Sequence, residues 1–185
     1  INAVSSVATG EYALVKQIAK ISQLWDETPF VLSTNKSAKG ETPVLGGLDD
    51  IMMMLEDHQV QVQTCMASRY IAGIKTLVED WDAKLKTIFD VLQEWTSVQK
   101  SWMYLEFIFS SGDIKKQLPE ESKMFTMVDK VFRNLMNDAA TTNNVASVCM
   151  EDNLLDSLVQ ATENLDRIQK RLEDYLETKR AAFPR

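Results

Sequence analysis

Glycine, proline and cysteine are scarce in this sequence. Six glycines and four prolines are few for 185 residues, and this scarcity disfavours an all-β fold, which needs many turns. The two cysteines, Cys65 and Cys149, lie far apart and belong to no CxxC pair or Cys/His cluster. They indicate neither a disulfide framework nor a zinc site, and a reducing compartment fits them best. The first expectation is therefore a helical protein.

Excess positive charge and long apolar runs are also lacking. The formal net charge is -7, whereas nucleic acids and anionic membranes bind proteins through clustered lysines and arginines. No apolar run approaches the roughly 20 residues that cross a bilayer, and the start of the chain does not resemble a secretion signal. We therefore expect no nucleic-acid or membrane partner.

Because the chain begins at Ile1 and ends at Arg185 directly after a helical pattern, we also expect it to be an excerpt of a longer polypeptide.

The first quarter of the chain predicts one helix and one β-hairpin. Apolar residues spaced three and four apart form one face of an amphipathic helix that ends near Glu27. Two β-prone runs, 30–34 and 42–45, flank the polar segment 35–41 and predict the two strands of a hairpin. Pro43 lacks a backbone N–H, so this hairpin is expected at a sheet edge.

A heptad pattern predicts a long helix in the middle of the chain. Asp49 or Asp50 is expected to cap a shorter helix before it. The long helix is predicted from about Tyr70 to Tyr104, roughly 50 Å at 1.5 Å per residue. Its apolar face follows two series with seven-residue spacing, which are Ile71, Val78, Leu85, Leu92 and Gln99, and Ile74, Trp81, Ile88, Trp95 and Trp102.

Two more helices are predicted after a break at residues 110–113. The first begins at Pro119, a residue that suits a first helical turn, and buries Phe125, Val128, Phe132 and Leu135. A polar gap at 139–144 separates it from a second heptad helix, whose stripe is Leu154, Leu158, Ala161, Leu165, Ile168, Leu172 and Tyr175. The predicted fold is mainly α, an elongated bundle of long antiparallel helices with one small β-hairpin. Residues 1–48 would hold the first helix and the hairpin, and residues 49–185 the bundle.

No catalytic, cofactor-binding or metal site is predicted. His58, the only histidine, shares a helical face with Cys65, but further ligands are lacking, so a hydrogen-bonded core histidine beside a buried cysteine is the preferred interpretation. Acidic doublets are typical of solvated helix faces. The segment 73–76 lacks the glycine-rich loop of a P-loop ATPase and lies inside the predicted long helix. The methionines at 52–54 favour gap filling between helices over an adaptable binding groove. We therefore predict that the chain is not an enzyme.

Two stretches resemble a known family. The segment WMYLEFIFSSGDI at 102–114, followed by QLPEE at 117–121, is similar to the patterns WxYLExIFxSxDI and QLPxE of the linker region of dynein heavy chains. The segment 165–185 is similar to LxxIQKxLxxYLExKRxxFPR of the same family. The likeness is nearly continuous from Trp25, although Phe107 replaces a common Pro and Gly112 a usual acidic residue. The motif residues, which include an expected hinge, are Trp102, Tyr104, Leu105, Glu106, Ile108, Phe109, Ser111, Asp113, Ile114, Gln117, Leu118, Pro119 and Glu120.

The resemblance implies a mechanical linker, a lever that arches over a ring of AAA+ modules and transmits ATP-driven changes of that ring to microtubule-based movement. No cofactor is expected here, because ATP and Mg²⁺ would bind elsewhere in the parent chain. The implied partners are the AAA+ ring of the same heavy chain, other dynein subunits and, indirectly, microtubules, in the cytoskeleton of a cilium or axoneme rather than in cytoplasmic dynein. We place the bend, as a hypothesis, between Phe109 and Pro119.

The residues alone leave a second interpretation open. Long heptad helices also suit a spectrin-like helical scaffold or interaction module. The sequence beyond Arg185 would separate the two interpretations, because a dynein must continue into P-loop modules and a scaffold need not.

Overall fold

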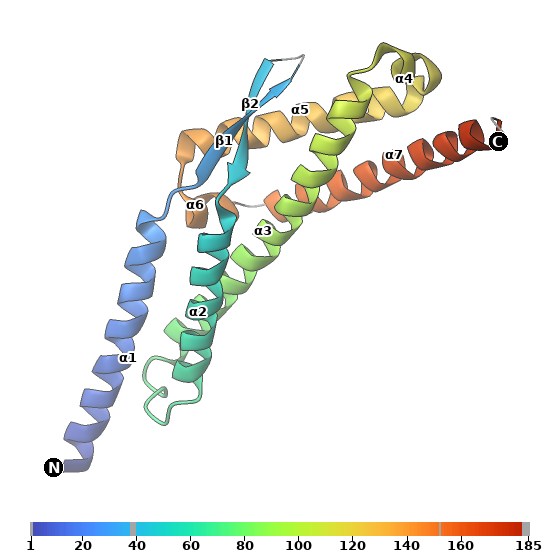
Figure 1. The fold of residues 1–185 in the computed structure, drawn as a ribbon. Helices are drawn as coiled ribbons and strands as arrows, with labels where there is room; N and C mark the ends of the chain where they lie inside the picture. Colours follow the sequence, from blue (N-terminus) through green and yellow to red (C-terminus); the bar gives the residue numbers. More distant parts are fainter. Residues whose placement is uncertain (1, 38–39, 152, 183–185) are drawn as a thin grey trace.

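The computed structural model describes residues 2–37, 40–151 and 153–182, and it is elongated and arched (Figure 1). Successive long helices run in opposite directions, and one two-stranded antiparallel sheet lies on one side of them. In chain order the elements are α1 (Asn2–Glu27), β1 (Val31–Ser37), β2 (Gly40–Gly46), α2 (Leu48–Met66), α3 (Lys75–Phe109), α4 (Gly112–Gln117), α5 (Pro119–Thr142), α6 (Val145–Cys149) and α7 (Leu154–Ala182). The expected mainly α fold with one small β-hairpin is confirmed. The division into 1–48 and 49–185 stays a prediction.

Helix α3 is the axis around which the other elements pack. It is 35 residues long, and it contacts α2 as well as α5, α6 and α7. The seven-residue series predicted for it are buried at Val78, Trp81, Leu85, Ile88, Leu92, Trp95 and Trp102. Because each fully buried large apolar side chain stabilises a fold by about 1.5–3 kcal/mol, this stripe accounts for much of the cohesion between the long helices.

The predicted bounds of this helix are wrong at both ends. It begins at Lys75 rather than Tyr70, and it ends at Phe109 rather than Tyr104. Ile71 nevertheless packs against the core from the turns that connect α2 to α3. The apolar spacing therefore continues through a non-helical segment, which is why it does not mark where the helix begins.

Burial along α5 and α7 follows the predicted stripes closely. In α7 the buried side chains are Leu154, Leu158, Ala161, Leu165, Ile168 and Leu172, with Tyr175 partly buried, and in α5 they include Phe125, Val128 and Phe132. Leu135 is only partly buried, whereas Met136 is fully buried. The expected polar gap at 139–144 is too long, because α5 continues to Thr142, and the short helix α6, which was not predicted, begins directly after it at Val145. Asn143 ends α5 with a left-handed φ of 47°.

The hairpin strands are longer than predicted. Their register runs from Val31 opposite Gly46 to Ser37 opposite Gly40, so most of the polar segment 35–41 belongs to the strands, and residues 38 and 39 lie outside the described residues. Hydrogen bonds between the two strands pair the backbone N–H and C=O groups of any residue type. The strands therefore continue through the polar residues that were expected to form a loop. The expected edge position of Pro43 is confirmed, since it lies in a two-stranded sheet.

The predicted cap of α2 is wrong. Gly47 holds the N-cap position with a left-handed φ of 56°, and no side chain caps the helix. Asp49 and Asp50 lie instead inside the first turn, where carboxylates interact favourably with the free amides and the helix dipole.

Helix α1 is attached near both of its ends. Near its start, a Cβ on Gly10 would lie 2.4 Å from the ring of Tyr70, so the absence of a side chain is what allows this approach. At its end, the Asn144 Nδ2 donates to the carbonyl of Asp26 at 2.8 Å, while the Asn144 Oδ1 accepts from the Ser147 N–H at 2.8 Å. The Asn144 side chain thus binds a carbonyl group at the end of α1 and also caps the start of α6.

His58 joins α2 to α1 through a buried hydrogen bond. The Trp25 Nε1 donates to the His58 Nδ1 at 3.0 Å, which requires that nitrogen to be unprotonated. Burial lowers the pKa of His58 below its ordinary value, and the neighbouring Asp57 carboxylate opposes this shift. The expected core histidine is therefore confirmed.

The folded protein is expected to lose stability as His58 is forced to protonate. Because the pKa is lower in the folded state than in the unfolded state, this contribution is present above about pH 6.5 and is lost as the pH falls towards the folded pKa. Between about pH 7 and pH 5 the loss is at most about 1.4 kcal/mol per pH unit. Urea denaturation across this range would measure it. His58→Gln should flatten the slope, and an unchanged slope would assign it to other groups.

Candidate functional site

The motif residues gather where α3, α4 and α5 meet at one end of the molecule (Figure 1). Trp102, Leu105, Glu106 and Phe109 are buried, and Ile108, Ile114 and Leu118 are partly buried. The remaining motif residues, Tyr104, Ser111, Asp113, Gln117, Pro119 and Glu120, are exposed. The structure therefore brings only the buried half of the motif into contact with the core, and the other half faces outward.

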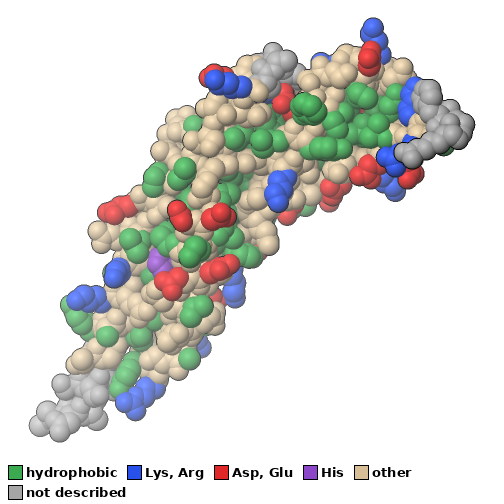
Figure 2. Space-filling model, in the orientation of Figure 1, with side chains coloured by type: hydrophobic (Ala, Val, Ile, Leu, Met, Phe, Trp, Pro, Cys, Tyr) green, Lys and Arg blue, Asp and Glu red, His purple; other side chains and the backbone are tan. Residues whose placement is uncertain are grey.

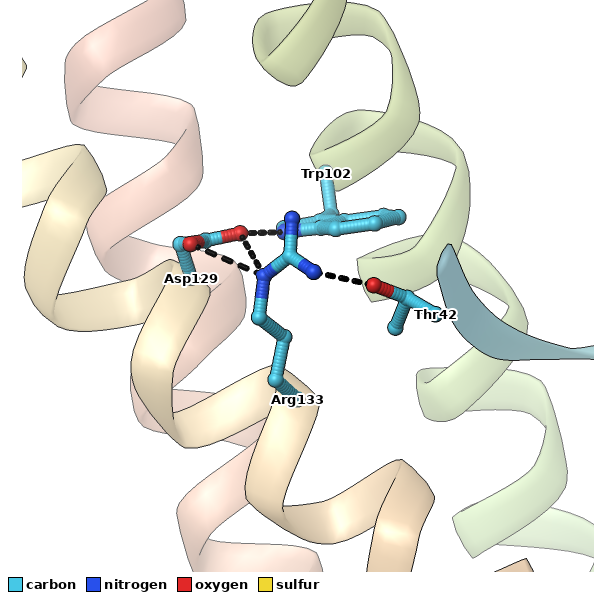
Figure 3. Close-up of polar contacts among 4 residues, drawn as sticks. All are labelled: Thr42, Trp102, Asp129 and Arg133. Carbon is cyan, nitrogen blue, oxygen red and sulfur yellow. Dashed lines mark hydrogen bonds and ion pairs between the residues drawn. The ribbon is translucent and has the colours of Figure 1, made fainter. Parts of the chain in front are cut away.

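Trp102 is part of a buried polar cluster that joins three elements (Figure 3). Its Nε1 donates to the Asp129 Oδ1 at 2.8 Å, and the Arg133 Nε donates to both oxygens of the same carboxylate at 3.0 and 3.1 Å. Arg133 also donates through Nη1 to the Thr42 hydroxyl, which lies on β2. We call these four residues the polar node. It ties α3, α5 and the hairpin together with charge-assisted hydrogen bonds.

Two aromatic stacks lie at the polar node and beside it. The rings of Trp102 and Phe132 are stacked with centroids 4.5 Å apart, and the rings of Phe109 and Phe125 are stacked with centroids 5.4 Å apart. Each pair joins α3 to α5, and such pairs add about 0.5–1.5 kcal/mol beyond the area they bury. The two helices are therefore joined at the node and again nearer to α4.

The connection between α3 and α5 is loosely packed by comparison. No residue of α4 is buried, and a Cβ added at Gly112 would meet nothing within 4 Å. Pro119 opens α5 at its first turn, as predicted. A change of direction would cost little packing within α4 itself. It would, however, move α3 relative to α5 and so separate the stacked rings of Phe109 and Phe125.

Gln99 fastens the hairpin to α3. Its Oε1 accepts from the Leu45 N–H at 2.7 Å, and its Nε2 donates to the Leu45 carbonyl at 2.9 Å. The amide side chain thus forms the two hydrogen bonds that a neighbouring strand would form. In the sequence the only signal was a polar residue in an otherwise apolar heptad series.

The partners in the polar node were also missed from the sequence. Asp129 and Arg133 are spaced four apart on one helix, a common surface pairing, and nothing in that spacing indicated burial. Thr42 is 91 residues from Arg133 in the chain, so its place in the node depends on the fold.

The other candidate groups do not converge on a reaction centre. His58 bonds Trp25 as described, and the Cys65 thiol donates to the Gln17 Oε1 at 3.5 Å. Burial raises the pKa of the Cys149 thiol to about 12, so it is not a reactive thiolate. The segment 73–76 spans the start of α3 and does not lie inside it, which corrects the prediction.

Residues 2–37, 40–151 and 153–182 contain neither a metal-binding group nor a helix that could cross a membrane. Among those residues, no three or more His, Cys, Asp or Glu side chains are grouped so as to hold a metal ion. No helix within them combines the length and the apolar character needed to cross a bilayer.

The sequence matches the family model described as "Dynein heavy chain, N-terminal region 2" over residues 1–185. This chain belongs to the dynein heavy chains. The match begins at residue 1, and so extends the likeness that the motifs indicated from Trp25 onward.

Three dynein relatives show how much of a heavy chain is present. Dynein axonemal heavy chain 6 of Homo sapiens is 39% identical over 182 residues, which are 98% of this chain and 4% of the relative. Dynein axonemal heavy chain 1 of Rattus norvegicus is 40% identical over all of this chain and 4% of its own length. The Dynein-1-alpha heavy chain of the flagellar inner arm I1 complex of Chlamydomonas reinhardtii is 39% identical, again over 100% of this chain and 4% of the relative. The chain thus spans about one twenty-fifth of the length of these dynein heavy chains.

Proposed function

We propose that this chain is the mechanical linker segment of a dynein heavy chain, a lever that transmits ATP-driven changes of the AAA+ ring to microtubule-based movement. The observation that carries the proposal is α3, a rod of 35 residues whose buried stripe holds α2, α5 and α7 against it. Such a rod resists bending because bending would separate packed side chains along its length. The membership in the dynein family supports this role over a generic scaffold.

The proposed setting follows from the relatives. Their names place them in axonemes and in a flagellar inner arm, so we propose that this chain works in the cytoskeleton of a cilium. Its partners would be the AAA+ ring of its own heavy chain, other dynein subunits and, indirectly, microtubules. ATP and Mg²⁺ would be bound by other parts of that heavy chain, and no cofactor is proposed for these residues.

The proposed bend lies between Phe109 and Pro119. The exposed helix α4 and the open space around Gly112 support this placement. The two aromatic stacks join α3 directly to α5, so a bend at this connection requires at least the stack of Phe109 on Phe125 to open. The motif residues of the exposed half, such as Ser111 and Asp113, would belong to the moving connection.

Softening the rod tests the lever directly. Gln93 and Ser97 are exposed on α3, so Gln93→Gly with Ser97→Gly weakens the helix by about 1 kcal/mol per site without touching the core. In the full-length motor we expect ATP hydrolysis to continue while microtubule gliding slows. The matched control is Gln93→Ala with Ser97→Ala, which keeps the helix. Equal gliding velocities in the two variants would contradict the lever.

Stiffening the connection tests the bend in the same assay. Ser111→Ala with Gly112→Ala favours helix across the connection by about 1 kcal/mol or more, and gliding should slow while ATP hydrolysis persists. The contrary result is that the Ser111→Ala/Gly112→Ala variant keeps the original gliding velocity while the Gln93→Gly/Ser97→Gly variant glides more slowly. That result would support the lever and place the bend outside residues 109–119.

A further inference from the structure

Helix α2 exposes apolar side chains on the side that faces away from the core. Met53 is 69% exposed and Val60 is 65% exposed. At about 3.6 residues per turn, both lie opposite the buried side of the helix, which includes Leu55 and Val62. The exposed Ala67, at the C-cap, continues the same seven-residue spacing. We call Met53, Val60 and Ala67 the α2 stripe.

The α2 stripe has the spacing of a helix-packing surface. Apolar residues seven apart are the pattern by which one helix packs along another, whereas a singly exposed apolar side chain needs no explanation. A shallow groove runs beside the stripe, and all of its lining residues come from α2 and its C-cap, namely Glu56, Gln59, Val60, Gln63, Thr64 and Ala67. The stripe can therefore receive a second helix without any rearrangement of the core.

The charges on α2 all have one sign. The helix contains no Lys or Arg, and its four acidic residues are exposed, namely Asp49, Asp50, Glu56 and Asp57. Every ion pair between described residues lies on α3, α5 or α7, so these four carboxylates have no cationic partner among them. Figure 2 shows acidic side chains grouped around His58, the one histidine, on this face of the molecule.

The neighbouring elements do not balance this charge. Residues 48–100, which run from α2 into the part of α3 beside it, hold nine acidic and five basic residues, a net charge of -4. Residues 2–27 of α1 hold three acidic and two basic residues, a net charge of -1. These two segments therefore carry -5 of the net charge of -7 of the whole chain.

We propose that the α2 stripe docks a basic amphipathic helix of a separate dynein subunit. The apolar side of that helix would cover Met53 and Val60, and its lysines and arginines would face the four carboxylates. A second copy of this chain does not fit, because it would bring the same negative charge to the contact.

The place of the α2 stripe suits a subunit that stays bound while the lever moves. It lies away from the proposed bend between Phe109 and Pro119 (Figure 1), so its occupant would travel with α2 and α3 without blocking that bend. The inference rests on the proposed function, in which other dynein subunits are partners, and it names the chemistry by which one of them binds.

Photo-crosslinking in the full-length heavy chain, assembled with its subunits in cilia, tests this assignment. Val60 is replaced by p-benzoylphenylalanine, and the assembled dynein is irradiated. The matched control carries the same group at Met127, which is 71% exposed on α5. We expect position 60 to crosslink to a separate subunit, at a segment with more Lys and Arg than Asp and Glu and with apolar residues three and four apart.

Charge reversal separates electrostatic docking from chance proximity. Glu56→Lys with Asp57→Lys should lower the crosslink yield at position 60 by about fivefold, because each change replaces an attraction by a repulsion. Glu56→Gln with Asp57→Asn, which removes the charges and keeps the side-chain sizes, should lower the yield less. The matched control is Glu173→Lys with Asp174→Lys, an exposed acidic doublet on α7, which should leave the yield unchanged.

Four results would overturn the proposal: a yield at position 60 no higher than at position 127, a crosslink to the heavy chain itself, a crosslinked segment without basic excess, or no response to charge reversal. None of them would affect the gliding result of the softened rod, so the lever and the docking fail separately.

Discussion

Trp95→Ala is expected to lower the free energy of unfolding by about 3–5 kcal/mol. The ring is completely buried in the middle of α3 and packs edge-on against Phe30, with centroids 5.6 Å apart. Removing it would leave a cavity between the rod and the start of the hairpin, which surrounding side chains can fill only in part. Guanidinium denaturation of residues 1–185, followed by circular dichroism, would measure the loss. A loss under about 1 kcal/mol would contradict the burial of this ring.

Replacing tryptophan by phenylalanine separates ring burial from hydrogen bonding. The Trp95 Nε1 is buried and has no hydrogen-bond partner among the described residues, whereas the Trp102 Nε1 donates to Asp129. Trp102→Phe should therefore cost about 1–2 kcal/mol more than Trp95→Phe, because it removes a donor from a buried carboxylate. If Trp95→Phe were the more costly change, the hydrogen bond of Trp102 would not be stabilising.

Asp129→Ala is expected to lower the free energy of unfolding by about 2–4 kcal/mol. The change leaves the Arg133 guanidinium without its carboxylate and removes the acceptor of the Trp102 indole. The side chain of Arg133 is 20% exposed, so water can compensate for part of the loss, and the expected cost is below that of a fully buried pair. The same denaturation experiment would measure it.

A double replacement shows whether the cost comes from an unpaired charge. Asp129→Leu with Arg133→Met removes both charges and keeps apolar volume, so it should be less destabilising than Asp129→Ala alone. A double variant at least as unstable as the single one would mean that the node stabilises the fold through its hydrogen bonds and not merely by compensating charge.

The long helices were predictable because their evidence is local and repeated. Seven-residue spacing indicated the buried tryptophans of α3, and the stripe of α7 was identified residue by residue. The ends of α3 were not predictable, because Ile71 continues the apolar spacing from a turn. Helix boundaries depend on capping groups, and the N-cap position of α3 has no side-chain hydrogen bond that a sequence pattern could have indicated.

The spacing of residues in the sequence could not predict the polar node. Asp129 and Arg133 have the same pattern as an exposed ion pair, and their burial follows only from α5 packing against α3 and β2. Thr42 begins the run 42–45 that was predicted as a strand, but the sequence does not indicate which helix that strand contacts. The motif at 102–120 was identified by resemblance alone, and only its buried and partly buried members contact the core.

In the pairing of Gln99 with Leu45, only Gln99 takes part through its side chain. Position 45 contributes its main chain to this pairing, and any residue other than proline would offer the same donor and acceptor. Position 99 must supply one donor and one acceptor from a single planar group, which a carboxylate cannot do and which asparagine would present one methylene short. The two sites are therefore constrained differently: position 99 by the hydrogen bonds of its side chain, and position 45 by the burial of the Leu45 side chain in the core.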